Sequence, residues 1–175
     1  IFSYDYQGYG TSQGRPSVAG AYQDVNAAYE YLTQRLGIPA NKIIVYGYSV
    51  GGGPSVDLAS RQPVAGLVIE SSFTTAFRVV TGIPVYPFDK FPNIDNIKNV
   101  NCPVLVIHGN ADRVIPFYHG QQLFAMVDQP KLSFWVNGAG HLNLLEVAGE
   151  EYVKVMTEFI RLVQYNQNSK LIVSD

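Results

Sequence analysis

The sequence predicts an α/β fold: a mostly parallel sheet with helices on both faces. Short runs of apolar, β-branched residues alternate along the chain with longer segments whose apolar residues recur at helical spacing. The composition is that of a globular domain with a single core, because 47% of the 175 residues are apolar and only 15% are charged. Such a chain is long enough and apolar enough to bury one sizeable core.

Composition and charge also exclude several classes of protein. With a formal net charge of −2, the chain has no broad basic surface, so a nucleic-acid partner is not expected. A single cysteine, Cys102, excludes an internal disulfide framework, and we expect it to be an inert buried thiol. No apolar run approaches 18 residues, which is the length that would predict a membrane span. We expect a cytoplasmic or membrane-peripheral protein.

The first half of the chain predicts two strands and two helices. Residues 1–6 have the pattern of a strand, and a turn-rich stretch follows them. Ser17 is the expected N-cap of a helix whose C′ residue is Gly37. Residues 42–48 form an apolar, β-branched run typical of a strand that is buried on both faces. A helix that begins with small residues is predicted over 51–61.

The second half continues the alternation. Further strands are predicted over 64–70, 104–108 and 131–136, and further helices over 117–127 and 151–163.

The segment 73–101 differs from a plain connection, because it is long, aromatic and weakly periodic. Two interpretations stay open: a short cap over an apolar acyl pocket, or ordinary filling between sheet and helices. The polar residues 164–175 are predicted to form a flexible tail. The predicted domain therefore covers residues 1–163.

Residues 47–51 carry the motif most informative about chemistry, GYSVG, which fits G-x-S-x-G. The motif lies between a predicted strand and a predicted helix, the context of a sharp turn that exposes a nucleophilic serine. Glycines two residues before and two residues after Ser49 remove side chains that would clash in such a turn. We predict Ser49 as the nucleophile; the alternative is a glycine-rich turn with an incidental serine.

A nucleophilic serine needs a base, and the base needs an orienting carboxylate. His141 follows the predicted strand 131–136, and Asp112 follows the predicted strand 104–108. Because the carboxyl ends of parallel strands share one edge of a sheet, we expect these side chains to meet Ser49 there.

Other residues compete for these roles. Glu70 also follows a predicted strand and, like Asp112, lies between Ser49 and His141 in the chain, so it stays an alternative acid. His108 ends a strand and is expected to pack beside the site. His119 falls inside a predicted helix, where we expect a surface or half-buried position. Asp5 precedes the serine, so a structural role is expected for it.

These motifs together resemble the α/β-hydrolase superfamily, whose members order their triad as serine, acid and histidine. The sequence is more narrowly similar to a serine-hydrolase branch that includes eukaryotic protein depalmitoylases and bacterial relatives. The stretches that carry the superfamily resemblance are DYQGYGTSQG (5–14), GYSVGG (47–52), HGNAD (108–112) and GAGH (138–141). Those that indicate the branch are GRPS (14–17), VDLASR (56–61) and FDKFPNI (88–94).

The resemblance covers the chain up to about residue 163 and implies that N-terminal strands are missing. In this fold, residues 1–6 correspond to the fourth strand, and the third strand carries a loop that supplies one oxyanion amide. We therefore expect an N-terminally truncated fold in which Val50 offers one oxyanion donor and the second donor is not present in this chain. Such a chain would be a partial enzyme with reduced activity unless a segment precedes Ile1.

We expect a serine hydrolase that cleaves a carboxylic ester or thioester through an acyl-enzyme on Ser49, with long-chain acyl groups among its candidate substrates. His141 would act as base and Asp112 would orient it. The expected partner is a small-molecule or acylated substrate, and the chemistry requires no cofactor or metal. The alternatives are a non-catalytic or truncation-inactivated binding protein on this fold, and a peptidase or acyltransferase.

Overall fold

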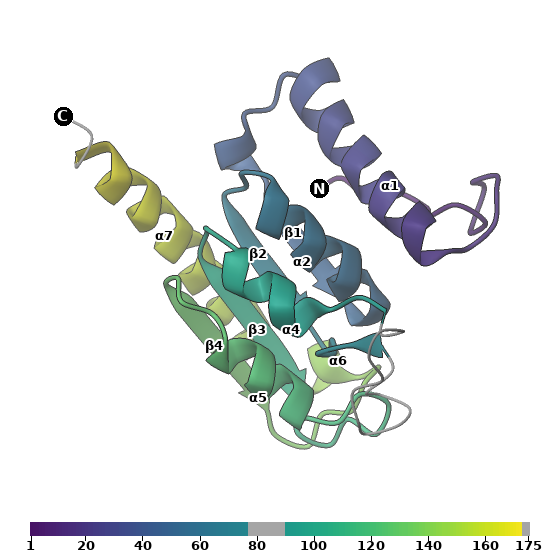
Figure 1. The fold of residues 1–175 in the computed structure, drawn as a ribbon. Coiled ribbons are helices and arrows are strands. Elements are labelled where there is room, and N and C mark those ends of the chain that lie inside the picture. The colour runs from purple at the N-terminus through teal and green to yellow at the C-terminus, as the bar shows by residue number, and fades with distance from the viewer. Residues whose placement is uncertain (77–89, 173–175) are drawn as a thin grey trace.

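A computed structural model describes residues 1–76 and 90–172 and has a parallel four-stranded sheet at its centre (Figure 1). The strands lie side by side in chain order, and a helix separates each from the next along the chain, as parallel pairing requires. They are β1 (Ile44–Tyr48), β2 (Gly66–Glu70), β3 (Val104–Gly109) and β4 (Lys131–Val136).

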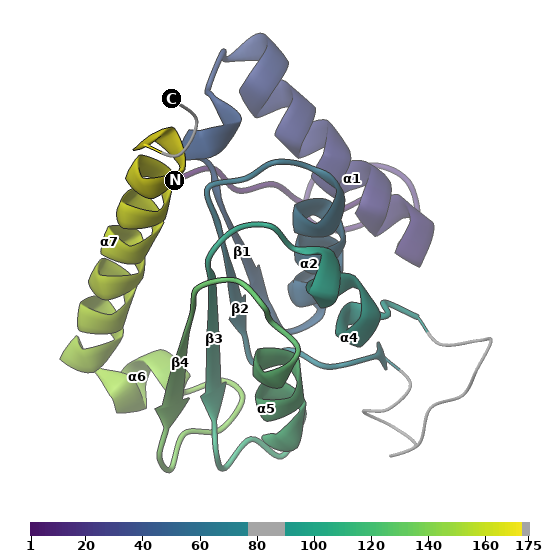
Figure 2. The ribbon, with the colours of Figure 1, turned by 60° about the vertical axis from the view of Figure 1, so that its left-hand side comes forward.

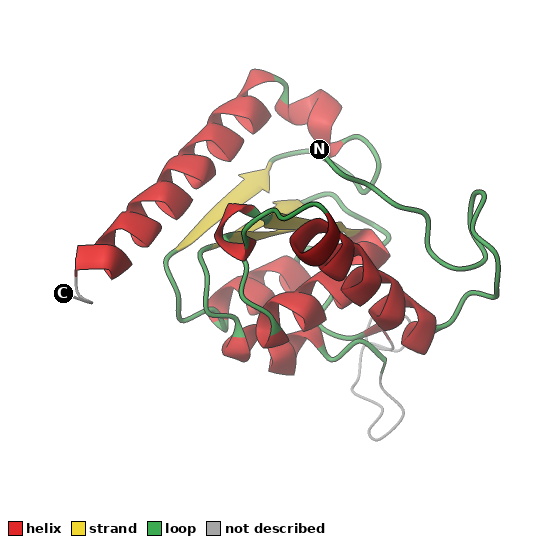
Figure 3. Ribbon diagram, turned by 90° about the horizontal axis from the view of Figure 1, so that it is seen from above, coloured by secondary structure: helices red, strands yellow, loops and turns green. Residues whose placement is uncertain are grey.

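Helices lie on both faces of this sheet, as the fold class predicted. They are α1 (Val18–Glu30), α2 (Gly52–Arg61), α4 (Asn93–Asn96), α5 (Tyr118–Ala125), α6 (Leu144–Ala148) and α7 (Glu150–Ile172). Figures 2 and 3 show α7 on one side of the strands, with α2, α4 and α5 on the other. Within residues 1–76 and 90–172, no helix combines the length and apolar character needed to cross a bilayer.

The alternation of side chains along the strands divides the core into two layers. Leu67 and Ile69 of β2 pack with α2 and α5, whereas Val68 between them packs with Phe159 and Val163 of α7. β2 is buried along its whole length, because it has a strand on each side and helices above and below.

The predicted strand over residues 1–6 is wrong. These residues form an extended loop, because a strand exists only where a neighbour accepts and donates backbone hydrogen bonds, and the described residues provide none. Side-chain contacts hold the loop instead. Phe2 stacks on Tyr31 with ring centroids 5.8 Å apart, and the main chain and side chain of Gln7 both donate to Asp24 of α1 at 2.8 Å.

The prediction that the strand over residues 42–48 is buried on both faces is also wrong. β1 pairs only with β2 among the described residues, and Tyr46 at its centre remains 48% exposed. The apolar run indicated a strand but contained no information about its position at the edge of this sheet.

The tail predicted over 164–175 also differs from the structure. Helix α7 continues past residue 163 to Ile172, while residues 173–175 lie outside the described part. No glycine or proline stops the helix in this stretch, and Gln167 Nε2 donates to the carbonyl oxygen of Asn41 at 2.6 Å.

The candidate cap segment is described only at its two ends, since residues 77–89 lie outside the described part of the chain. The Ala76 N–H donates to the Lys90 carbonyl oxygen at 2.8 Å, which closes the base of the segment. Farther along, Phe91 and Ile97 are buried, and Ile97 packs in the core beside α2. These two side chains contribute to the core, and a short cap within 73–101 stays a prediction.

Phe159 offers a test of the layer beneath α7. Its side chain has no exposed surface, so we expect Phe159→Ala to lower the free energy of unfolding by about 3–5 kcal/mol. The neighbouring Ile160 is 43% exposed on the same helix, and Ile160→Ala should cost no more than about 1 kcal/mol. Urea unfolding of the two variants provides the comparison; equal midpoints would contradict this packing.

Candidate active site

The carboxyl edge of the sheet brings Ser49, Asp112 and His141 together. Ser49 lies in a 3₁₀ turn directly after β1, Asp112 in the loop after β3, and His141 in the loop after β4. His141 Nε2 lies 2.9 Å from Ser49 Oγ, and His141 Nδ1 lies 2.7 Å from Asp112 Oδ2. Because Nδ1 faces a carboxylate it carries the hydrogen, which leaves the lone pair of Nε2 directed at the serine.

The turn at Ser49 holds its backbone in an uncommon conformation. Ser49 has a φ of 52°, in the left-handed region that costs an L-residue about 1–2 kcal/mol. The chain folds back so closely that a Cβ on Gly47 would lie 2.7 Å from the Gly51 carbonyl oxygen. Glycine at 47 is therefore a steric requirement, as the motif indicated.

The second position that requires glycine is Gly52, and not Gly51 as the motif predicted. A Cβ on Gly51 would meet only Tyr6 Oη at 3.8 Å, an ordinary contact. A Cβ on Gly52 would lie 2.1 Å from Ser72 Oγ, where there is no room for it. Ser72 is buried, and its hydroxyl donates to the Ser49 carbonyl oxygen at 2.9 Å. The sequence pattern gave no signal for Ser72, which is distant in the chain from the turn that it holds.

Asp112 is fixed by hydrogen bonds to both of its carboxylate oxygens. Oδ1 accepts the N–H groups of Val114 and Ile115, each at 2.8 Å, and Oδ2 accepts from His141. The Asp112 side chain is fully buried. Its own loop thus holds the carboxylate in the orientation that faces the imidazole.

His108 hydrogen-bonds to the same loop. Its Nε2 donates to the Ile115 carbonyl oxygen at 2.9 Å and lies 3.5 Å from Asp112 Oδ2. Burial lowers the pKa of His108, which outweighs the opposing effects of the Ile115 hydrogen bond and the Asp112 charge. A neutral imidazole in this position agrees with the packing role expected from the sequence.

The predicted position of His119 is wrong, because its side chain is fully buried. Its Nδ1 accepts the Thr74 N–H at 3.2 Å and lies 3.0 Å from Thr74 Oγ1. His119 therefore ties α5 to the segment that follows β2. Its spacing of four residues from Leu123, also fully buried, could have indicated the inward face of the helix.

Glu70, the alternative acid, is engaged by two tyrosines. Its Oε2 accepts the hydroxyl groups of Tyr46 and Tyr152, each at 2.7 Å. Burial and the hydrogen bond to Glu70 raise the pKa of Tyr152 to about 12, although the nearby Tyr46 hydroxyl lowers it. Glu70 thus closes a network between β1 and α7, and the geometry favours Asp112 as the partner of His141.

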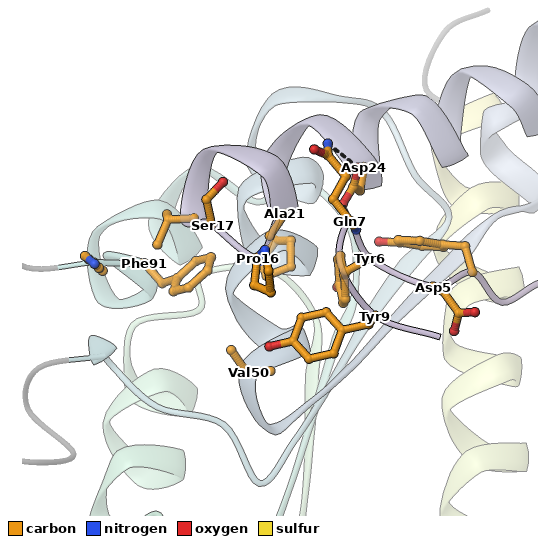
Figure 4. Close-up of a pocket in the computed structure, with 14 residues that line it drawn as sticks. Asp5, Tyr6, Gln7, Tyr9, Pro16, Ser17, Ala21, Asp24, Val50 and Phe91 are labelled. Carbon is orange, nitrogen blue, oxygen red and sulfur yellow. Dashed lines mark hydrogen bonds between the residues drawn. The ribbon is translucent and has the colours of Figure 1, made fainter. Parts of the chain in front are cut away.

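A cavity of about 560 Å³ lies beside the serine turn (Figure 4). The N-terminal loop, α1, Val50 and Phe91 line it, and much of its lining is aromatic or aliphatic. Figure 4 shows Val50 facing this space and the Gln7–Asp24 contact that holds the loop on α1. Within residues 1–76 and 90–172, no group of three histidine, cysteine or acidic side chains is arranged to hold a metal ion.

Comparison with known proteins agrees with this fold. A profile of the dienelactone hydrolase family matches residues 11–142. The chain belongs to this family, within the α/β-hydrolase superfamily.

More particular similarity is found among curated relatives. Alpha/beta hydrolase domain-containing protein 17B of Xenopus laevis is 45% identical over 162 residues, which are 91% of this chain and 56% of that protein. The Homo sapiens protein of the same name is 44% identical with the same coverage. The chain thus spans little more than half the length of these relatives.

Among solved structures, an esterase from Pyrococcus furiosus superposes with a TM-score of 0.74. The match covers 90% of this chain and 68% of that one at 19% identity, which establishes a common fold.

The burial of His108 predicts a pH dependence of stability. The unfolded chain binds a proton at this residue below about pH 6.5, whereas the folded protein resists protonation until a lower pH. The free energy of unfolding should therefore fall as the pH drops below about 6.5, by at most about 1.4 kcal/mol per pH unit from this group.

We expect His108→Gln to reduce this pH dependence, because its amide keeps a donor toward Ile115 but does not titrate. Urea unfolding at about pH 7.5 and about pH 5.5 measures the effect, since these values bracket the unfolded pKa. An equal loss of stability in the wild type and the variant would contradict the assignment.

Proposed function

We propose that this chain carries the catalytic centre of a serine hydrolase that cleaves a carboxylic ester or thioester through an acyl-enzyme on Ser49. The hydrogen-bond chain from Ser49 Oγ through the His141 imidazole to the Asp112 carboxylate is the observation that carries this proposal. Both distances lie within the range of good hydrogen bonds, and the intervening ring has its two nitrogens on the correct sides.

In the proposed reaction, Ser49 Oγ attacks the acyl carbon while its proton passes to His141 Nε2. The tetrahedral intermediate collapses, the bond to the leaving oxygen or sulfur breaks, and the imidazolium returns that proton to the leaving group. A water molecule then attacks the acyl carbon of the acyl-enzyme and gives its proton to His141. The bond from that carbon to Ser49 Oγ breaks, Oγ takes the proton back from His141, and the acid product leaves. Asp112 stabilises the imidazolium that forms in each half of the reaction.

The developing negative charge on the acyl oxygen requires hydrogen-bond donors. The Val50 N–H, at the start of the turn that leads into α2, is the proposed donor, since the first amides of a helical segment have no partner within it. We assign no second donor within the described residues.

An apolar acyl group is the substrate part that best fits the neighbouring surface. The cavity that Val50 lines is predominantly aromatic and aliphatic, and its volume lies within the range of small-ligand sites. The sequence resemblance to protein depalmitoylases supports a thioester of a long-chain acid as one candidate substrate. Oxygen esters of apolar acids fit the same chemistry.

A fluorophosphonate probe tests the proposed nucleophile, because it reacts with activated serines. Intact-mass analysis should find one adduct per wild-type chain and none on Ser49→Ala. His141→Ala should slow labelling by roughly 10⁴- to 10⁶-fold, as the loss of a triad base does in serine proteases.

Ser60→Ala is the matched control for these variants. Ser60 lies on α2 with its hydroxyl bonded to the Asp57 carbonyl oxygen, and its loss should leave the adduct unchanged. A folded wild-type chain that forms no adduct would refute a competent hydrolase in favour of a non-catalytic or truncation-inactivated protein on this fold. Hydrolysis of amides but not esters by a labelled chain would favour a peptidase.

The choice between the two acids is tested by a pair of isosteric variants. Asp112→Asn should lower kcat for a p-nitrophenyl ester by about 10⁴-fold, because the amide stabilises the wrong imidazole tautomer. Glu70→Gln should reduce stability but change kcat less than about tenfold, since its oxygen faces two tyrosines and not His141. The reverse ranking would make Glu70 the acid.

A further inference from the structure

Strand β1 carries two tyrosines, and their hydroxyl groups have different partners. Tyr46 donates to Glu70, as described above. Tyr48 donates to the main-chain carbonyl oxygen of His141 at 2.7 Å. The Tyr48 ring also packs beside the His141 imidazole, with centroids 5.3 Å apart and planes inclined by 33°.

The hydrogen bond from the Tyr48 hydroxyl is the main contact that fixes the backbone of His141. Among residues 1–76 and 90–172, no other hydrogen bond reaches the main chain of His141. The preceding residue is held within the loop, since the Gly140 N–H donates to Asn143 Oδ1 at 2.8 Å. The following residue, Leu142, is 87% exposed and gives little packing support.

Tyr48 is also the residue directly before Ser49 in the chain. It is the last residue of β1 and its backbone leads directly into the turn that presents Ser49, while its hydroxyl holds the loop that presents His141. Ser49 and His141 are 92 residues apart in sequence, so their 2.9 Å contact depends on how these two loops are held together. A displacement of about 1 Å at such a contact is enough to lower a reaction rate about 10²-fold.

We propose that Tyr48 is a positioning residue, which holds His141 at hydrogen-bond distance from Ser49 by clamping the His141 carbonyl to the nucleophile turn. The inference rests on the proposed function for the identity of the reacting pair. It assigns a specific role to the first variable position of the G-x-S-x-G motif in this chain, a position that the motif leaves open.

The chemistry of the Tyr48 hydroxyl suits this role. Burial raises its pKa, and the nearby Glu70 and Asp112 carboxylates raise it further. The hydroxyl therefore stays protonated, and donates to the carbonyl, across the whole range in which a histidine can act as a neutral base.

Tyr48→Phe tests the proposal, because it keeps the ring and removes only the donor. We expect the maximal rate of fluorophosphonate labelling to fall roughly 10- to 100-fold, with little change in the probe concentration that gives half of that rate. Tyr46→Phe is the matched control: it removes a hydroxyl two residues earlier on the same strand, so it should destabilise the protein but label at the wild-type rate.

A second measurement does not depend on labelling. The hydrogen on His141 Nδ1, shared with Asp112, should give a downfield proton resonance in the NMR spectrum of the wild type and of Tyr46→Phe. In Tyr48→Phe the released loop should expose this hydrogen to exchange with water, and the resonance should broaden.

The outcomes separate the two proposals. Wild-type labelling and resonance retained in Tyr48→Phe would overturn the role of Tyr48 and leave the hydrolase intact. Equal slowing in Tyr46→Phe and Tyr48→Phe would also overturn it, since general destabilisation would then explain both. If no chain is labelled, the proposed function fails, and the Nδ1 resonance alone decides whether Tyr48 holds the loop.

Discussion

The left-handed backbone of Ser49 is the constraint on which the rest of the site depends. This conformation turns the chain sharply between β1 and α2, so that the side chain projects from the sheet edge instead of packing between the layers. The surroundings stabilise it from both directions. Gly47 lets the returning chain approach, and Ser72 fixes the Ser49 carbonyl oxygen from the neighbouring strand end.

The acid and the base, Asp112 and His141, are held differently from Ser49. Hydrogen bonds that involve main-chain groups fix them, and neither depends on a strained backbone. The Asp112 carboxylate binds two amides of its own loop, and His108 closes that loop through the Ile115 carbonyl oxygen. The imidazole of His141 is then held by Asp112 on one side and lies against the Tyr48 ring on the other. The position of the serine is thus set by its backbone turn, whereas the position of the base is set by hydrogen bonds and ring packing from Asp112 and Tyr48.

The proximity of Ser49, Asp112 and His141 was predictable from sequence. Each of them falls just after a strand, and parallel strands end at one edge of the sheet. The Ser17 N-cap was predictable for a local reason: its hydroxyl accepts the Gly20 N–H three residues on. The strand expected over 1–6 failed because strand formation depends on a partner that no local pattern specifies. The choice between Asp112 and Glu70 likewise depended on distant side chains.

The tyrosine pair around Glu70 has a consequence for how the site could change during evolution. A second acid, Glu70, stands at the end of β2, and it offers a route by which the acid role could pass from β3 to β2. The two tyrosine hydroxyls oppose that route, because the carboxylate would first have to leave both of them. Hydrogen bonds from two separate elements, β1 and α7, therefore keep Glu70 in a structural position and oppose any such migration.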